Sequence, residues 1–230
     1  MRTRKVYPLY QYRLPMGILL GPRRNPLLIL VVAILKLIRS PAFVRQNFHW
    51  SERRRGVQPG KDLAERIAEM RSKPEFASWL DLGCSRLDAP PGDLRILSAR
   101  LMSPDRRHLG SLSVYRISKA RVYVEVFQAD FHTWTTDGRC LITSNQATLP
   151  RLPDYIDFQR VKGDVARVWS RHLQRCEQVT PLAIESDEEL GRLLEKESED
   201  QAELLRAARI QGPITEVEMP GDWEDVAKAS

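Results

Sequence analysis

The sequence predicts an α+β fold: an antiparallel β-meander of about four or five strands, covered on one face by amphipathic helices, behind a basic and partly apolar N-terminal segment. Three observations support this prediction. Short β-type runs separated by turn residues lie between residues 93 and 144, two helical patterns follow them, and an apolar run surrounded by Lys and Arg precedes them. With 230 residues, of which 42% are hydrophobic, the chain is large enough for one domain with its own core.

The charge of the chain is distributed very unevenly. Residues 1–60 carry a net charge of +11, residues 61–180 carry +4, and residues 181–230 carry −9. A strongly basic region favours an anionic partner, either lipid headgroups or nucleic acid. The acidic C-terminal region can also neutralise the basic region within the same molecule.

These shifts in composition divide the chain into four regions. They are a basic segment with a short apolar helix, a candidate membrane anchor, at residues 1–46; a basic linker at residues 47–60; an α+β domain at residues 61–180; and an acidic C-terminal helix and tail at residues 181–230. The cysteines are odd in number and far apart, which argues against a disulfide framework and favours a reducing compartment. They are Cys84, Cys140 and Cys176.

The apolar run of the N-terminal segment is too short to cross a membrane as an ordinary helix. Residues 27–35 are all apolar, and residues 37 and 38 extend the run beyond Lys36. As a helix, residues 27–38 would be about 18 Å long, because each residue adds about 1.5 Å, whereas a bilayer core is about 30 Å thick. Six basic residues lie on each side of the run, so charge asymmetry selects no orientation. These features favour a segment that lies in the interface of an anionic membrane, with both basic flanks on one side.

Membrane contact is therefore expected from the basic and apolar residues of this segment. The expected contact residues are Arg23, Arg24, Leu27, Leu28, Ile29, Leu30, Val31, Val32, Ile34, Leu35, Lys36 and Arg39. Two alternatives stay open: the run is a buried helix of a soluble cytoplasmic protein, or it is a helix that docks onto a protein partner. A cleaved signal peptide fits less well, because a long basic region precedes the run and no Ala-x-Ala site follows it. Nucleic acid is the disfavoured partner, because the sequence contains no RNA-binding or zinc-finger motif.

The domain is predicted to begin with a helix at Asp62, whose apolar residues recur at helical spacing until Lys73-Pro74 ends it. The meander should start at Asp93. Its candidate strands are residues 94–99, 113–117, 122–127, 131–136 and 139–144. Asp137-Gly138 lies between the last two runs and is typical of a two-residue hairpin turn, because this pair tolerates positive φ.

Two more helices are predicted after the meander. The first is capped by Asp164 and carries an apolar stripe suited to covering one face of the sheet. The stripe consists of Val165, Val168, Trp169, His172, Leu173 and Cys176. The second begins at a capping box, Ser186 with Glu189, and ends before Gly212-Pro213. Its polar middle suits a protein partner, and residues 213–230 are expected to form a loose acidic tail.

Residues 79–85, Trp-Leu-Asp-Leu-Gly-Cys-Ser, resemble the first motif of the S-adenosylmethionine-dependent methyltransferases. Asp81 and Gly83 match that motif, whereas Ser85 and Leu87 stand at two positions where the family has glycine. The resemblance implies a cofactor-binding glycine loop in an alternating, mostly parallel α/β fold. The predicted series of strands without intervening helices disagrees with that fold, so we expect an ordinary strand end or turn here.

Two histidine–cysteine pairs are candidate chemical sites. His172 and Cys176 lie four residues apart on one helical face, a spacing that suits metal ligands, but the face is otherwise apolar. We therefore expect a satisfied core histidine and a buried thiol there. His132 and Cys140 should lie on opposite faces of the hairpin, because a two-residue turn pairs Thr135 with Cys140. No metal site and no cofactor are expected.

The sequence thus predicts a membrane-associated protein with a non-enzymatic binding or structural role, whose α+β domain is held at an anionic membrane surface on the cytoplasmic side. The alternatives are a soluble cytoplasmic protein and an enzyme whose site no familiar motif reveals. For such an enzyme the first suspects are Asp81, Cys84, His132 and Cys140. A protein partner at the C-terminal helix is compatible with each hypothesis.

Overall fold

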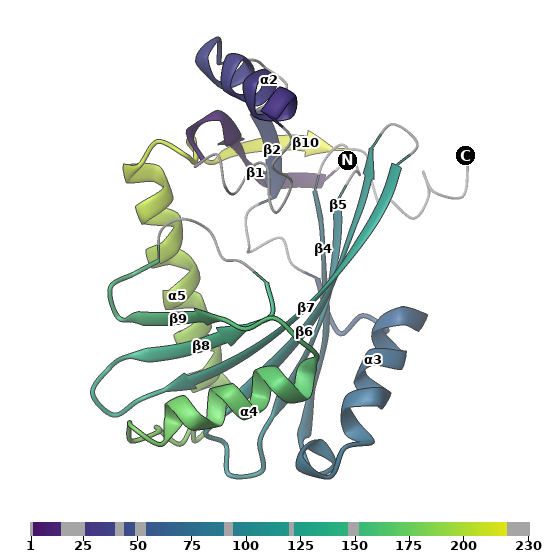
Figure 1. Ribbon diagram of the computed structural model, residues 1–230, viewed down its shortest axis with the longest axis vertical. Helices are drawn as coiled ribbons and strands as arrows, with labels where there is room; N and C mark the ends of the chain where they lie inside the picture. The colour runs from purple at the N-terminus through teal and green to yellow at the C-terminus, as the bar shows by residue number, and fades with distance from the viewer. Residues whose placement is uncertain are drawn as a thin grey trace.

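The computed structural model describes residues 2–14, 26–39, 44–48, 54–89, 94–119, 122–146 and 152–219. Within these ranges the strands are β1 (Arg2–Tyr10), β2 (Val44–Phe48), β3 (Arg54–Arg55), β4 (Leu80–Ala89), β5 (Leu94–Met102), β6 (Leu109–Lys119), β7 (Val122–Trp134), β8 (Cys140–Ser144), β9 (Ile156–Arg160) and β10 (Thr215–Met219). The helices are η1 (Gln11–Arg13), α2 (Pro26–Leu37), α3 (Lys61–Arg71), η4 (Pro74–Phe76), α4 (Val165–Cys176) and α5 (Asp187–Ala207). The protein therefore has the predicted α+β fold (Figure 1).

The larger sheet contains the predicted meander. Its strand order is β3-β4-β5-β6-β7-β8-β9 in the described part of the chain. Strands β4 to β8 follow one another as antiparallel neighbours, whereas β9 pairs with β8 in parallel. Strand β7 continues without a break from Val122 to Trp134 and so joins two runs that the sequence separates. The meander is thus confirmed, with longer strands than expected.

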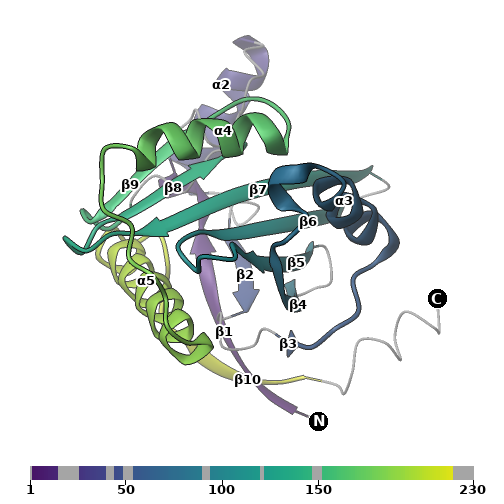
Figure 2. The same ribbon diagram turned by 90° about the horizontal axis from the view of Figure 1, so that it is seen from below.

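Helices cover both faces of this sheet. Figure 2 shows α3 and α4 over one face and α5 against the other. The core beneath α3 and α4 is rich in aromatic residues, namely Phe76, Trp79, Phe131 and Trp169. The core beneath α5 contains Met102, Leu109, Trp134, Ile142 and Leu190. The alternation of side chains along β7 supplies both cores, because Phe131 and Trp134 point to opposite faces.

The caps that begin α4 and α5 are the predicted ones. The Asp164 side chain accepts a hydrogen bond from the backbone N–H of Arg167 at 2.9 Å. The Ser186 hydroxyl accepts one from the backbone N–H of Glu189 at 3.1 Å. Each side chain satisfies a backbone N–H that has no partner within the first helical turn, which fixes where the helix begins.

The β7–β8 hairpin has a longer loop than the sequence predicts. Thr135 N–H donates to the Arg139 carbonyl at 2.9 Å, and Gly138, with a φ of 83°, donates to the Thr135 carbonyl at 3.0 Å. The Asp137 carboxylate accepts from the Thr135 hydroxyl and from Arg139 Nε, which stabilises this three-residue loop. Trp134, not Thr135, therefore lies opposite Cys140. The predicted register is wrong by one residue, and such a shift moves side chains to the other face.

The two ends of the chain meet in the smaller sheet, whose strand order is β10-β1-β2. Lys5 of β1 lies opposite Glu216 of β10, so basic and acidic ends face each other. The prediction of a loose tail from residue 213 is wrong for residues 215–219, because these form β10 and pair with β1. The sequence did not reveal this strand, because its partner lies at the other end of the described chain. Residues 220–230 lie outside the described residues, and β2 and β3 occupy part of the predicted linker.

Candidate functional site

Helix α2 presents apolar side chains to solvent. It stands apart from the large sheet, beyond the small one (Figure 1). Leu37 is 83% exposed, Ile38 64% and Leu30 57%. Ile29, Val31 and Ile34 are also exposed. A contiguous apolar patch of this kind on a protein surface marks a site of contact with a membrane or another protein.

The opposite side of α2 makes a polar contact with the body of the protein. Lys36 Nζ donates a hydrogen bond of 2.7 Å to the Leu14 carbonyl, and Leu14 is itself buried. Val32, Leu35 and Lys36 are half-buried, consistent with a side turned toward the protein. The helix ends at Leu37, and the turn that follows contains Arg39, which is exposed and has a φ of 50°. Helix α2 thus contacts the protein on one side and exposes its other, apolar side to solvent.

The predicted contact residues can now be placed. Ile29, Leu30, Val31, Ile34 and Arg39 are exposed on or just after α2. Arg23 and Arg24 lie outside the described residues, as do the side chains of Leu27 and Leu28. The alternative in which the run is a buried core helix disagrees with these exposures. Within the described ranges, no helix has both the length and the apolar character needed to span a bilayer.

The methyltransferase-like stretch belongs to an ordinary antiparallel strand. Strand β4 continues through it to Ala89 and pairs with β5, with a bulge between Asp81 and Cys84. Gly83 lies in the bulge with a φ of 85°, and its N–H donates to Asp81 Oδ1 at 2.7 Å. In the methyltransferase motif the glycines form a loop at the strand end, whereas here the strand continues. The resemblance to that family is therefore not supported.

A cleft of about 570 Å³ lies between this bulge and the N-terminal half of α5. Side chains of both charges line it, among them Arg100, Asp187 and Glu195. Burial and the nearby Asp81 carboxylate raise the pKa of the Cys84 thiol, so this lining cysteine is not activated as a nucleophile.

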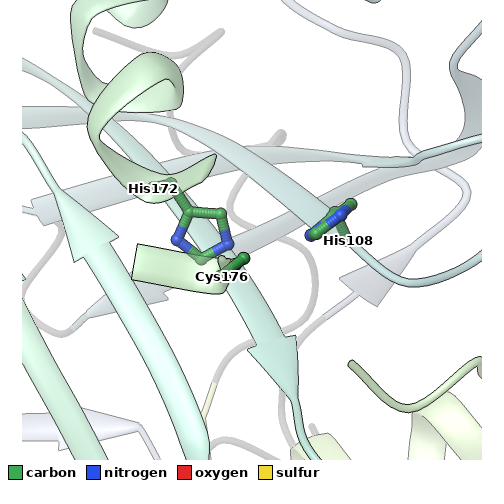
Figure 3. A group of neighbouring side chains, drawn as sticks. All are labelled: His108, His172 and Cys176. Carbon is green, nitrogen blue, oxygen red and sulfur yellow. The ribbon is translucent and has the colours of Figure 1, made fainter. Parts of the chain in front are cut away.

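A first histidine–cysteine cluster lies between α4 and the sheet. Figure 3 shows His172 and Cys176 on α4 with His108 beside them. Their ligand atoms lie within 4.8 Å of one another. The Thr133 hydroxyl oxygen contacts all three: it is 2.7 Å from His108 Nδ1, 2.8 Å from His172 Nε2 and 3.6 Å from Cys176 Sγ. A protein hydroxyl therefore occupies the centre of this cluster.

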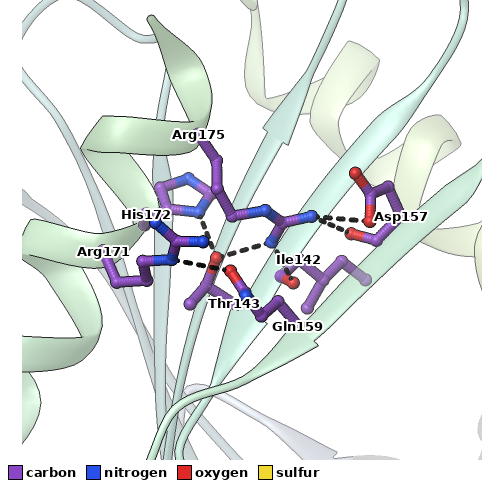
Figure 4. A network of polar contacts seen from close by, with 7 residues as sticks. All are labelled: Ile142, Thr143, Asp157, Gln159, Arg171, His172 and Arg175. Atoms are coloured by element: carbon purple, nitrogen blue, oxygen red, sulfur yellow. Dashed lines mark hydrogen bonds and ion pairs between the residues drawn. The ribbon is translucent and has the colours of Figure 1, made fainter. Parts of the chain in front are cut away.

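The polar contacts of His172 account for both of its ring nitrogens, and Figure 4 shows those on the Thr143 side. Arg175 donates to the Thr143 hydroxyl at 2.7 Å, and that hydroxyl is 3.0 Å from His172 Nδ1. Because Arg175 can only donate, the arrangement that satisfies every group has Thr143 donating to Nδ1 and the Nε2–H of His172 donating to Thr133. Burial lowers the pKa of His172 well below its usual value. The predicted satisfied core histidine and buried thiol are confirmed.

A second cluster forms on the opposite face of the sheet. His132 of β7, Cys140 of β8 and Glu197 of α5 bring their ligand atoms within 4.8 Å of one another. The prediction that His132 and Cys140 lie on opposite faces is wrong, because the longer hairpin loop shifts their register. Sequence patterns did not indicate Glu197, because only the packing of α5 on the sheet brings it here.

The groups of this second cluster influence one another electrostatically. Burial opposes protonation of His132, but the carboxylates of Glu197 and Asp130 outweigh it, so its pKa is raised. Burial and the Glu197 carboxylate raise the pKa of the Cys140 thiol. The cysteine therefore stays protonated, which argues against a Cys–His nucleophile.

Comparison with protein-family models, with curated proteins and with solved structures found no match for this chain. The function is therefore argued from the geometry of these sites.

Proposed function

We propose that this protein is a peripheral membrane protein, in which α2 enters the interface of an anionic membrane and holds the α+β domain at its surface. The domain then has a non-enzymatic binding or structural role on the cytoplasmic side. The observation that carries the proposal is the exposure of the apolar side chains of α2, with Leu37 at 83% and Ile38 at 64%.

Charge favours a lipid surface over a protein partner. Residues 1–60 contain twelve Lys and Arg and a single acid, Glu52. Immediately after α2, Arg39 is exposed next to Leu37 and Ile38, so a cationic group and apolar groups reach the surface together. This combination is typical of helices that lie in the interface of anionic membranes.

The expected strength of attachment is moderate. Full burial of a Leu or Ile side chain contributes about 1.5–3 kcal/mol, and a half-exposed side chain contributes about half of that. Each Lys or Arg near an anionic surface adds about 1 kcal/mol. Four apolar residues that are at least half exposed, namely Leu30, Ile34, Leu37 and Ile38, together with a few cations therefore give reversible binding of micromolar order, at about −8 kcal/mol.

The cysteines support a reducing compartment. Cys84, Cys140 and Cys176 are all free and buried. A buried thiol is stable where disulfides do not form, as on the cytoplasmic side of a membrane.

The test is sedimentation of the full chain with lipid vesicles. The double variant Ile34→Asp/Leu37→Asp places two carboxylates on the exposed face of α2, where they are repelled by anionic lipid. We expect wild-type protein to bind vesicles containing phosphatidylserine, and the double variant to bind at least about 30-fold more weakly. Vesicles of phosphatidylcholine alone should bind wild-type protein about tenfold more weakly than anionic ones, since they lack the electrostatic attraction.

The control is Leu173→Asp, because Leu173 is an apolar residue of α4 that is 39% exposed. It should bind anionic vesicles within about twofold of wild type, because α4 does not face the membrane. Equal binding by the double variant and wild type would overturn the proposal, as would an equal loss in the control. Selective capture of a protein by α2 without vesicle binding would favour the partner-docking alternative instead.

A further inference from the structure

We propose that His132, Cys140 and Glu197 form a binding site for a divalent metal ion of the zinc type, between β7, β8 and α5. The site lies within the α+β domain and its occupancy does not depend on how the protein attaches to a membrane. It therefore adds a second binding property to the proposed function.

The first argument is the convergence of three ligand atoms. The imidazole of His132, the thiol of Cys140 and the carboxylate of Glu197 come from three different elements and lie within 4.8 Å of one another. Zinc bonds of about 2.1 Å to nitrogen and 2.3 Å to sulfur place tetrahedral ligands about 3.5 Å apart. Rotation about side-chain bonds can bring the three ligand atoms from within 4.8 Å of one another to the separation that zinc requires.

The second argument is the lack of hydrogen-bond partners at the same place. His132 Nδ1 and Glu197 Oε2 are buried 3.7 Å apart, close enough for an ion pair when His132 is protonated, but neither atom has a hydrogen-bond partner among the described residues. Asp130, two residues before His132 on the same face of β7, also has a buried carboxylate oxygen without such a partner in the described chain. Buried polar groups in native proteins are almost always paired, and a bound cation would satisfy His132 Nδ1 and Glu197 Oε2.

The third argument is the contrast with the cluster on the other face. There His172 has a threonine hydroxyl on each ring nitrogen, and Thr133 fills the space between the three ligand atoms. The two clusters thus contain the same histidine and cysteine chemistry. The first is satisfied by hydrogen bonds to protein groups, whereas the second adds a carboxylate and leaves His132 Nδ1 and Glu197 Oε2 without a hydrogen bond among the described residues.

The charges around the second cluster suit a cation. The carboxylates of Asp130 and Glu197 both raise the pKa of His132, whereas the positive charge of Arg100 on β5 lowers it. Burial holds the Cys140 thiol protonated, and a coordinated divalent ion would displace that proton to the solvent as the thiolate binds. Imidazole, thiolate and carboxylate are together the ligands that zinc prefers.

An ion can reach the site from the side of α5. The side chains of His132 and Glu197 remain 11% and 20% exposed, whereas Cys140 is fully buried beneath them. Three protein ligands leave one tetrahedral position for water.

The test is metal binding by the full chain after removal of metals with a chelator. Titration with Zn²⁺ should show one tight site per chain, and melting should shift upward by about 5–10 °C at a hundredfold excess over Kd. Co²⁺ should give a thiolate-to-metal charge-transfer band. The Glu197→Gln variant should bind Zn²⁺ at least about tenfold more weakly, and the Cys140→Ser variant should lose the band.

The matched control is Cys176→Ser, in the cluster on the opposite face, which should keep both the band and the affinity. Glu197→Gln changes a partly exposed helix side chain, so it tests the site even where Cys140→Ser weakens the fold. Absence of zinc binding by wild-type protein would overturn the proposal. So would a band that is lost in Cys176→Ser and kept in Cys140→Ser, or affinity unchanged in Glu197→Gln.

Discussion

Replacement of Phe131 with alanine should lower the free energy of unfolding by about 3–5 kcal/mol. Phe131 is fully buried on the α4 face of β7. Its ring centroid lies 5.0 Å from that of Trp169, 5.9 Å from that of Phe76 and 6.0 Å from that of Trp79. The substitution removes a large apolar side chain and leaves a cavity among the rings of Trp169 on α4, Phe76 on η4 and Trp79 between η4 and β4. Urea unfolding, followed by circular dichroism, measures the change.

A suitable control for this substitution is Leu173→Ala, since Leu173 lies on α4 but is 39% exposed. The control substitution should lower the free energy of unfolding by less than about 1 kcal/mol, because little buried surface is removed. If Phe131→Ala cost no more than this control, the aromatic cluster would not be the main core of the domain.

Stability should fall steeply as the pH drops below about 6.5. Burial lowers the pKa of His172 well below its ordinary value of 6.5, and burial also lowers that of His108, against the attraction of Asp105. The stability that these neutral histidines contribute is complete above the unfolded-state pKa. It is lost as the pH falls from there toward the folded-state pKa, because the unfolded chain gains protons that the folded chain excludes. Each histidine contributes a slope of about 1.4 kcal/mol per pH unit.

The His172→Gln variant isolates this effect. Glutamine can exchange hydrogen bonds with the neighbouring hydroxyls and does not titrate. The free energy of unfolding, measured with urea between pH 6.5 and 5, should therefore fall less steeply with decreasing pH in the variant, by up to about 1.4 kcal/mol per pH unit. His132 is present in both proteins, so its contribution to the pH dependence cancels in the difference. Parallel curves for the two proteins would show that His172 is not kept neutral by the core.

Elements whose signals are local were predictable from the sequence. Helix α4 follows directly from its apolar stripe and from Asp164, which caps it as expected. The meander follows from alternation and turn residues. The register of the β7–β8 hairpin could not be predicted in the same way, because Asp137-Gly138 is compatible with loops of two or three residues. The choice of loop depends on the contacts of Asp137 with Thr135 and Arg139.

Features that depend on remote contacts could not be predicted in this way. Strand β10 forms because it pairs with β1, and the sequence of this acidic segment contains no local pattern that predicts the pairing. Glu197 joins His132 and Cys140 only through the packing of α5 on the sheet. The apolar run was evident in the sequence, but its exposure on α2 depends on the rest of the fold. The bulge in β4 likewise explains Gly83 without a cofactor loop.

Whether α2 enters the bilayer interface is tested most directly by fluorescence quenching with lipids that are brominated on their acyl chains. Leu37→Trp places a reporter on α2 and Leu173→Trp places one on α4; each is compared with wild type, whose five tryptophans set the background. With anionic brominated vesicles, we predict additional quenching for the tryptophan at position 37 and none for that at position 173. Equal quenching at both positions, or none at position 37 under conditions where the protein sediments with the vesicles, would contradict the membrane-contact role of α2.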